Sequence, residues 1–160
     1  MKFTKMHGCG NDYVYINLFE EKVDDPAKLS TIVSDRHFGI GSDGVITIGP
    51  SDIADFRMRI YNADGSEAEM CGNGIRCVAK YVYDHKLTDK TEISVESGAG
   101  IKYLTLYTKD GKVEQVRVDM GEPILEPDKI PVIADGSCVV DEPIEAGGKQ
   151  WRMTCVSMGN

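Results

Sequence analysis

Residues 62–77 constrain the fold of this chain most, because they join a glycine-rich turn to the start of a helix. The apolar residues that follow the turn recur at helical spacing: Ile75, Val78, Ala79 and Val82. This spacing predicts a helix that buries one face in a core, with Cys71 at or near its first residue. Unpaired backbone N–H groups and the positive end of the helix dipole gather at such a position, so it favours a bound anion or a reactive thiol. Gly72 and Gly74 leave this backbone uncovered, so a small ligand can approach it.

The residues alone leave two interpretations of Cys71 open. Cysteine is among the most often buried residue types, so a thiol near the start of a helix can be only a small core residue. A core cysteine, however, does not need two glycines and an asparagine after it, and glycine in a first helical turn lowers helix propensity. These neighbours favour a chemical role for Cys71.

Strands and one further helix are predicted around this segment. The strands are expected at residues 12–18, 45–48, 55–61, 92–96, 101–107 and 113–119. The further helix is expected after Asp25, which can cap it, with Pro26 in its first turn. Its inner face is expected to carry Leu29, Ile32 and Val33. Short strands around few helices indicate an α+β architecture, with a mostly antiparallel sheet curled around the helix that follows Cys71.

The composition changes near residue 120. Four of the six prolines lie beyond that point: Pro123, Pro127, Pro131 and Pro143. Proline-rich segments often separate domains, so we expect one domain at residues 1–119 and a boundary at 119–121.

Charge and composition exclude several classes of partner. The net charge is -8 and the isoelectric point is about 4.9, which argues against nucleic acid or an anionic membrane as the main partner. No apolar run approaches the length of a membrane span, and the first residues lack the apolar core of a signal peptide. The five cysteines are odd in number and widely spread, which fits free thiols in the cytoplasm better than a disulfide framework.

Six short blocks occur in order along the chain. They are MHGCGND at 6–12, RHFGIGSDG at 36–44, YNADGS at 61–66, MCGNGIRC at 70–77, MGEP at 120–123 and VSMGN at 156–160. Together they resemble the diaminopimelate epimerase family, over the whole chain but only over the N-terminal part of such an enzyme. The resemblance implies two pseudo-symmetric domains, each a sheet curled about a central helix, with the site in the cleft between them. Residues 120–160 would then form only the opening portion of the second domain.

The same resemblance implies an activity. Family members interconvert LL- and meso-diaminopimelate by inversion at one α-carbon, without pyridoxal phosphate or a metal. Two cysteine thiols act as acid and base on opposite faces of that carbon, and the second cysteine lies beyond residue 160. Because inversion needs both thiols, we expect the 160-residue chain alone to be inactive. The implied partners are the amino-acid substrate and, at full length, a second copy in a homodimer.

Cys71 is then one acid–base group, and the backbone N–H groups at Gly72 and Asn73 are the candidates for holding the reacting carboxylate. The resemblance also implies substrate contacts for Asn11, Asn62 and Asn160. From the residues alone, Asn11 and Asn62 are equally well explained as turn residues beside Gly10 and before Asp64-Gly65.

The other thiols are expected to be structural. Cys77 lies six residues after Cys71, so at about 100° per residue it is roughly 240° around the helix and cannot reach the same carbon. Cys9 lies between two glycines and is expected to be non-catalytic, and Cys138 and Cys155 are expected to pack. The histidines and cysteines lack the paired spacing of a zinc site, so no metal site is predicted.

Two rival functions stay open. In the first, a cysteine hydrolase or transferase, Cys71 attacks a carbonyl with His7 or His37 as the base and the helix start as the oxyanion hole. In the second, the same backbone pocket binds an amino acid without catalysis.

Overall fold

The computed structural model describes residues 1–158. The chain divides into two compact units, Met1–Asp119 and Met120–Asn160. The first unit holds the eight-stranded sheet and both α-helices, and the second holds a short hairpin and one 3-10 turn.

The first unit is an α+β fold. Its strands are β1 (Thr4–Gly8), β2 (Asn11–Asn17), β3 (Gly44–Gly49), β4 (Phe56–Asn62), β5 (Glu67–Ala68), β6 (Glu92–Ser97), β7 (Gly100–Lys109) and β8 (Lys112–Val118). The order across the sheet is β1-β2-β3-β4-β6-β7-β8, and β5 pairs with β4. The β2–β3 and β4–β6 pairs are parallel and the remaining pairs of this sheet are antiparallel. The predicted mostly antiparallel sheet is therefore confirmed.

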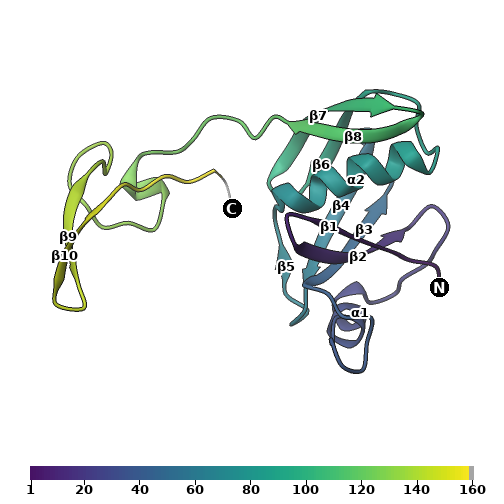
Figure 1. Ribbon diagram of the computed structural model, residues 1–160, viewed down its shortest axis with the longest axis horizontal. Helices are drawn as coiled ribbons and strands as arrows, with labels where there is room; N and C mark the ends of the chain where they lie inside the picture. The colour runs from purple at the N-terminus through teal and green to yellow at the C-terminus, as the bar shows by residue number, and fades with distance from the viewer. Residues whose placement is uncertain (159–160) are drawn as a thin grey trace. The chain divides into compact units, whose positions relative to one another are not determined.

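Helix α2 (Gly72–Asp84) is the centre of this unit. It contacts β1 and β8, the two edge strands, and also β2 and β7. Figure 1 shows the sheet curling around α2, with β8 along one side of the helix and β1 along the other. The residues that it buries are Gly74, Ile75, Cys77, Val78, Ala79, Tyr81 and Val82. These include the whole predicted apolar stripe, so the central helix is confirmed.

Helix α1 (Pro26–Val33) covers the opposite face of the sheet and contacts β3 and β4 (Figure 1). Strands β2 and β3 therefore lie between two helices and are buried on both faces, which explains their continuous apolar sequences. On the α1 side, one cluster combines Val14, Ile16 and Val45 with residues of α1 and its neighbouring loops.

The predicted start of α1 is confirmed, and one residue of its predicted inner face is wrong. Asp25 caps the helix by accepting a hydrogen bond from the Lys28 N–H at 2.9 Å. Ile32 is 60% exposed, whereas Ser30 is fully buried. The Ser30 hydroxyl lies 2.9 Å from the Tyr61 carbonyl oxygen and 2.8 Å from that of Asn62, so a polar anchor replaces the expected apolar contact.

The second unit contains η1 (Pro127–Lys129) and the antiparallel pair β9 (Glu142–Ala146) and β10 (Lys149–Met153). The expectation that Cys138 packs in a core is wrong, because its side chain is exposed. Cys155 is partly buried. None of the helices in residues 1–158 combines the length and the apolar character needed to cross a membrane.

Candidate active site

The turn between β1 and β2 sets the position of Asn11. Cys9 and Gly10 both have positive φ angles, 54° and 85°, and Gly8 pairs with Asn11 across them. Two consecutive residues of this kind form the type I′ turn that matches the twist of a two-stranded hairpin. Asn11 is therefore the first residue of β2 and is held in a fixed register.

Strand register then brings a second asparagine to the same end of the sheet. Tyr13 in β2 pairs with Gly44 at the start of β3, and Gly44 pairs with Asn62 at the end of β4. Asp43 links these strand ends, because its N–H donates to the Asp12 carbonyl at 2.7 Å and its carbonyl accepts from the Ala63 N–H at 3.0 Å.

Cys71 is the N-cap residue of α2, which confirms that it lies at the mouth of the helix. Its backbone is extended, with φ -143° and ψ 106°, and its carbonyl accepts the first helical hydrogen bond, from the Ile75 N–H at 2.9 Å. Its Sγ accepts a hydrogen bond from the Gly74 N–H at 3.2 Å. Within the described part of the chain, the N–H groups of Gly72 and Asn73 donate to no acceptor. Two helix-terminal donors are therefore free beside the thiol.

The two glycines after Cys71 have different structural reasons. A Cβ atom at Gly74 would lie 2.6 Å from Cδ1 of Ile46, whose side chain is completely buried. A Cβ atom at Gly72 would meet only the Arg76 guanidinium, at 3.9 Å. Gly74 thus allows α2 to pack closely on β3, while Gly72 leaves open space at the start of the helix.

The Cys71 thiol faces the Asn11 side chain. Its S–H donates to Asn11 Oδ1 at 3.2 Å, and Asn11 Nδ2 donates to Asp43 Oδ2 at 2.7 Å. The Asn11 side chain therefore bonds to groups distant in sequence and not to its own turn. Tyr13 also lies near this pair, and burial together with the neighbouring Cys71 raises the pKa of its phenol.

Arg76 braces the first turn of α2 through two hydrogen bonds. Its guanidinium donates to the Gly72 carbonyl at 2.9 Å and to Asn73 Oδ1 at 2.5 Å. The Asn73 side-chain oxygen is therefore occupied, and the backbone N–H stays available for the predicted ligand role.

Asn62 has the turn contacts that the residues alone suggested. Its Nδ2 donates to Ser66 Oγ at 3.0 Å, and its carbonyl accepts from the Gly65 N–H at 2.9 Å. Its side-chain oxygen has no hydrogen-bond partner among residues 1–158 and can accept from a ligand. Asn160, the remaining predicted contact, lies outside the described residues.

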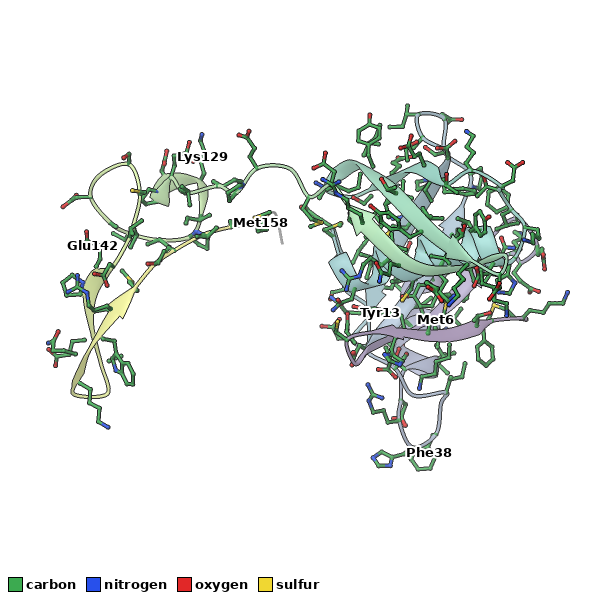
Figure 2. All side chains as sticks on the ribbon, turned by 45° about the horizontal axis from the view of Figure 1, so that its top comes forward. Met6, Tyr13, Phe38, Lys129, Glu142 and Met158 are labelled. Atoms are coloured by element: carbon green, nitrogen blue, oxygen red, sulfur yellow. The ribbon has the colours of Figure 1, made fainter. Side chains whose placement is uncertain are left out.

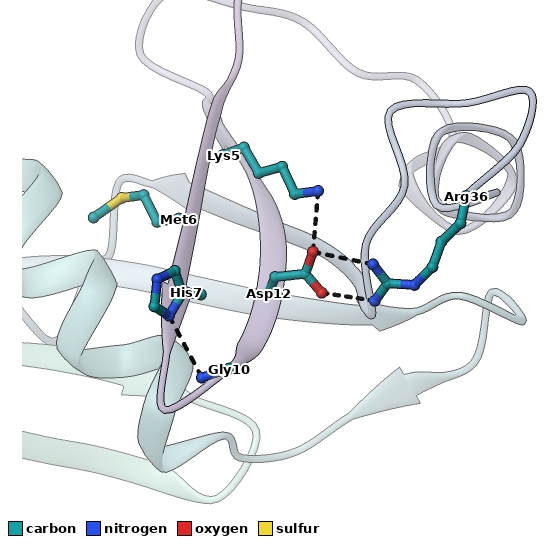
Figure 3. Close-up of a pocket in the computed structure, with 6 residues that line it drawn as sticks. All are labelled: Lys5, Met6, His7, Gly10, Asp12 and Arg36. Atoms are coloured by element: carbon teal, nitrogen blue, oxygen red, sulfur yellow. Dashed lines mark hydrogen bonds and ion pairs between the residues drawn. The ribbon is translucent and has the colours of Figure 1, made fainter.

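A charged cluster borders the site. Asp12 accepts hydrogen bonds from Arg36 at 2.7 and 3.3 Å, and Lys5 Nζ lies 3.0 Å from its carboxylate (Figure 3). The Arg36 guanidinium also donates to Asp43 Oδ1 at 2.9 Å. Hydrogen bonds from Arg36, followed by those from Lys5, hold the pKa of Asp12 at about 2.

The remaining candidates lie away from the thiol contacts. Cys77 is buried in the core, and burial raises the pKa of its thiol. His7 Nδ1 accepts a hydrogen bond from the Gly10 N–H at 3.4 Å. His37 lies in a loop beside Phe38, which is 98% exposed and points away from the sheet in Figure 2. Neither histidine is among the hydrogen-bond partners of Cys71 in the described chain, so the base required by the hydrolase interpretation is not in contact with it. No group of three or more metal-ligating side chains is arranged to hold an ion in residues 1–158.

Sequence reasoning missed Asp43, Arg36 and Arg76, although each lies in one of the six blocks. Blocks 36–44 and 70–77 contain these residues. Asp43 and its partner Asn11 lie in different blocks, so only the register of β2 and β3 shows that they meet, whereas Arg76 binds residues of its own block. For Asp43, the glycine that follows it was the one local signal in the sequence.

Comparison with known proteins identifies the family of the chain. The sequence profile described as diaminopimelate epimerase matches residues 3–126. The diaminopimelate epimerase of Agathobacter rectalis is 81% identical over the whole of this chain, which covers 59% of that relative. The enzyme of the same name from Acetivibrio thermocellus is 61% identical, again over the whole chain and 57% of the relative. The chain thus spans less than three fifths of the length of these curated relatives.

Solved structures show the same fold at low sequence identity. A hydroxyproline epimerase from Agrobacterium vitis superimposes with a TM-score of 0.64 at 15% identity, over 96% of this chain and 48% of that one. A probable proline racemase from Agrobacterium radiobacter superimposes with a TM-score of 0.65 at 16% identity, with the same coverage. Because the family profile matches residues 3–126 and a curated relative is 81% identical, the chain belongs to the diaminopimelate epimerase family.

Proposed function

We propose that this chain supplies one half of the active site of a diaminopimelate epimerase, with Cys71 as one of its two acid–base groups. The observation that carries the proposal is the arrangement at the start of α2. A thiol that is only partly buried lies beside two free backbone N–H groups, on a helix end that favours negative charge.

This arrangement suits proton transfer at the α-carbon of an amino acid. A thiolate on one face removes the α-proton, and the electron pair left on carbon is shared with the adjacent carboxylate. A thiol on the other face then delivers a proton to the same carbon. The Gly72 and Asn73 N–H groups would bind the carboxylate and stabilise the charge that develops on it.

Asn11 and Asn62 are proposed to contact the substrate from the sheet, together with Asn160. Asn62 offers a free side-chain oxygen, which suits an ammonium group. The second acid–base group is proposed to come from outside residues 1–158, because Cys77 is enclosed in the core and Cys9 lies exposed in the β1–β2 turn.

The test requires a complete enzyme. A chimera can join residues 1–160 of this chain to the part of the Agathobacter rectalis relative that follows the matched region, since the two sequences are 81% identical. We expect the chimera to convert LL- to meso-diaminopimelate, and Cys71→Ala to lower kcat by at least about 100-fold, as loss of a general acid–base group does.

Cys9→Ala is the matched control, because it removes a different accessible thiol, one that is exposed, from the same unit. It should retain most of the rate. Turnover in the Cys71→Ala chimera close to that of the parent would refute the proposed role of Cys71.

We further propose that the full-length enzyme acts as a homodimer in the cytoplasm. The five free cysteines support a reducing compartment. The homodimer rests on the family resemblance and can be checked by sedimentation of the chimera, for which we expect the mass of two chains.

A further inference from the structure

We infer that Asp43 is a positioning residue: it holds the Asn11 amide so that the carbonyl oxygen, and not the NH2 group, faces the Cys71 sulfur. Asp43 does not touch the sulfur itself, and it acts through Asn11. The inference deepens the proposed function, because it takes Cys71 as the acid–base group.

The orientation of Asn11 follows from the chemistry of its two partners. Asp43 Oδ2 lies 2.7 Å from Asn11 Nδ2 and is a carboxylate oxygen, which can only accept hydrogen bonds. The amide nitrogen must therefore point at Asp43. The other end of the planar amide, Oδ1, is then directed at Cys71 Sγ, 3.2 Å away.

Asp43 is itself held on both carboxylate oxygens. Oδ2 also accepts the Asp12 N–H at 3.1 Å, and Oδ1 accepts from the Arg36 guanidinium at 2.9 Å. A carboxylate fixed at two points cannot rotate away from Asn11 without breaking these bonds. The fixed direction of Asn11 is thus built into the ends of β2 and β3.

This direction affects the chemistry of the thiol. A carbonyl oxygen accepts the proton of an S–H group, but its negative end repels a thiolate. An NH2 group in the same place would donate to the thiolate and favour it. By excluding the second arrangement, Asp43 keeps the Cys71 S–H group directed at the Asn11 carbonyl oxygen. The titratable groups that interact electrostatically with Cys71, namely Tyr13, Tyr15 and Cys77, are all buried.

Asp43→Asn tests this with little change in shape. The new side chain has one acceptor oxygen in place of two, so it cannot serve Arg36 on one side and Asn11 with Asp12 on the other. A charged guanidinium forms a stronger hydrogen bond than a neutral amide, so we expect the oxygen to stay with Arg36 and the Asn11 amide to turn over and present NH2 to the sulfur. We expect the second-order rate constant of Cys71 alkylation by iodoacetamide at pH 7 to rise about five-fold. This is the factor that corresponds to the net free energy of one hydrogen bond.

The rate is measured on the 160-residue chain by mass spectrometry of the peptide that carries Cys71. Alkylation does not require turnover, so the outcome is independent of whether the enzyme epimerises diaminopimelate. Cys77 reports on folding, because its buried thiol reacts only when the core opens. Its rate should stay unchanged.

Two controls distinguish an effect of Asp43 through Asn11 from the effect of removing a negative charge near Cys71. In an Asn11→Ala background, Asp43→Asn should change the Cys71 rate less than two-fold, because the residue through which Asp43 acts is gone. Glu69→Gln removes a negative charge two residues before Cys71, and Glu69 is not among the hydrogen-bond partners of Asn11 in residues 1–158. It should also change the rate less than two-fold.

An unchanged Cys71 rate in Asp43→Asn, or an equal increase in the Asn11→Ala background, would overturn the inference. If the Asp43→Asn variant does not fold, NMR of the wild-type chain tests the orientation of the Asn11 amide directly. Asn11 Nδ2 and the Asp12 N–H both donate to Asp43 Oδ2, so the Asn11 side-chain NH2 protons should show contacts to the Asp12 amide proton. If the Asn11 NH2 protons instead showed contacts to the Cys71 β-protons, and none to the Asp12 amide proton, the inference would be contradicted.

Discussion

Cys71 and Asn11 meet across 60 residues of sequence because a hairpin turn and a helix start place them at the same end of the sheet. Each side chain has two defined partners. The sulfur lies between the Gly74 N–H and Asn11 Oδ1, and the Asn11 amide lies between Cys71 and Asp43. The thiol environment is thus set by directed hydrogen bonds and not by burial alone.

Asp12 allows a prediction about stability at low pH. Its pKa is lowered from 3.8 to about 2 in the folded protein, chiefly by hydrogen bonds from Arg36. A carboxyl group whose pKa is lower in the folded than in the unfolded state stabilises the fold at pH values above its unfolded-state pKa. This contribution is lost as the pH falls through its folded-state pKa. Because the Arg36 side chain is 55% exposed, we expect Asp12→Asn to lower the free energy of unfolding at pH 7 by only about 1 kcal/mol.

Urea unfolding followed by circular dichroism checks this prediction. The difference between wild type and Asp12→Asn should be equal at pH 7 and pH 5, and smaller at pH 3. Asp24→Asn is the control, because Asp24 and its partner Lys22 are both highly exposed. A difference for Asp12→Asn that stays constant from pH 7 to pH 3 would show that the ion pair is not its source.

At the scale of elements, the first turn of α2 must pack on β3 and still leave its donors free. Gly74→Ala places a methyl group against the buried Ile46, and overpacking of this kind costs about 1–3 kcal/mol. Gly72→Ala places one in open space, where alanine gains up to about 1 kcal/mol of helix propensity. We therefore expect Gly74→Ala to lower the free energy of unfolding and Gly72→Ala to leave it unchanged or raise it.

Chemical denaturation of the two variants gives the comparison, and Ile46→Val provides a further check. The valine lacks the Cδ1 atom that the new methyl group would meet, so the combination with Gly74→Ala should cost less than the sum of the two single changes. Strictly additive costs would mean that Ile46 is not the obstacle.

Much of this element structure could be predicted from the sequence. Strong periodic patterns located α2 and β4, where Phe56, Met58 and Ile60 are buried and the arginines between them are exposed. Asp25 and Pro26 located the start of α1. These signals are local, and tertiary packing agrees with them.

Elements without a local apolar pattern could not be predicted. In β9 every residue is exposed, so no alternation marks it, although the Gly147-Gly148 pair at positive φ is a hairpin signal. Strand β1 has few β-branched or aromatic residues and depends on pairing with β2. The bond between Asp43 and Asn11 depends on strand register, which a single sequence does not reveal.

At the scale of the whole molecule, the described chain provides one convincing acid–base thiol. Cys77 is enclosed by the core, Cys9 lies in a turn, and Cys138 and Cys155 belong to the second unit. That unit exposes a set of large apolar side chains: Leu125, Ile133, Val140, Ile144, Trp151, Val156 and Met158. Exposed apolar surface promotes self-association, so activity has to be compared over a range of protein concentrations.

The most direct test of the proposal that this chain supplies only one half of the active site is incubation of the 160-residue chain with LL-diaminopimelate in heavy water. Deuterium at the α-carbon and the meso isomer are followed together, beside the chimera as the positive control and its Cys71→Ala variant as the negative control. Inversion needs an acid–base group on each face of the carbon, so we expect the chimera to form deuterated meso product and the chain alone to form none. Meso product from the chain alone at a rate near that of the chimera would contradict the account, because a second acid–base group would then lie within these 160 residues.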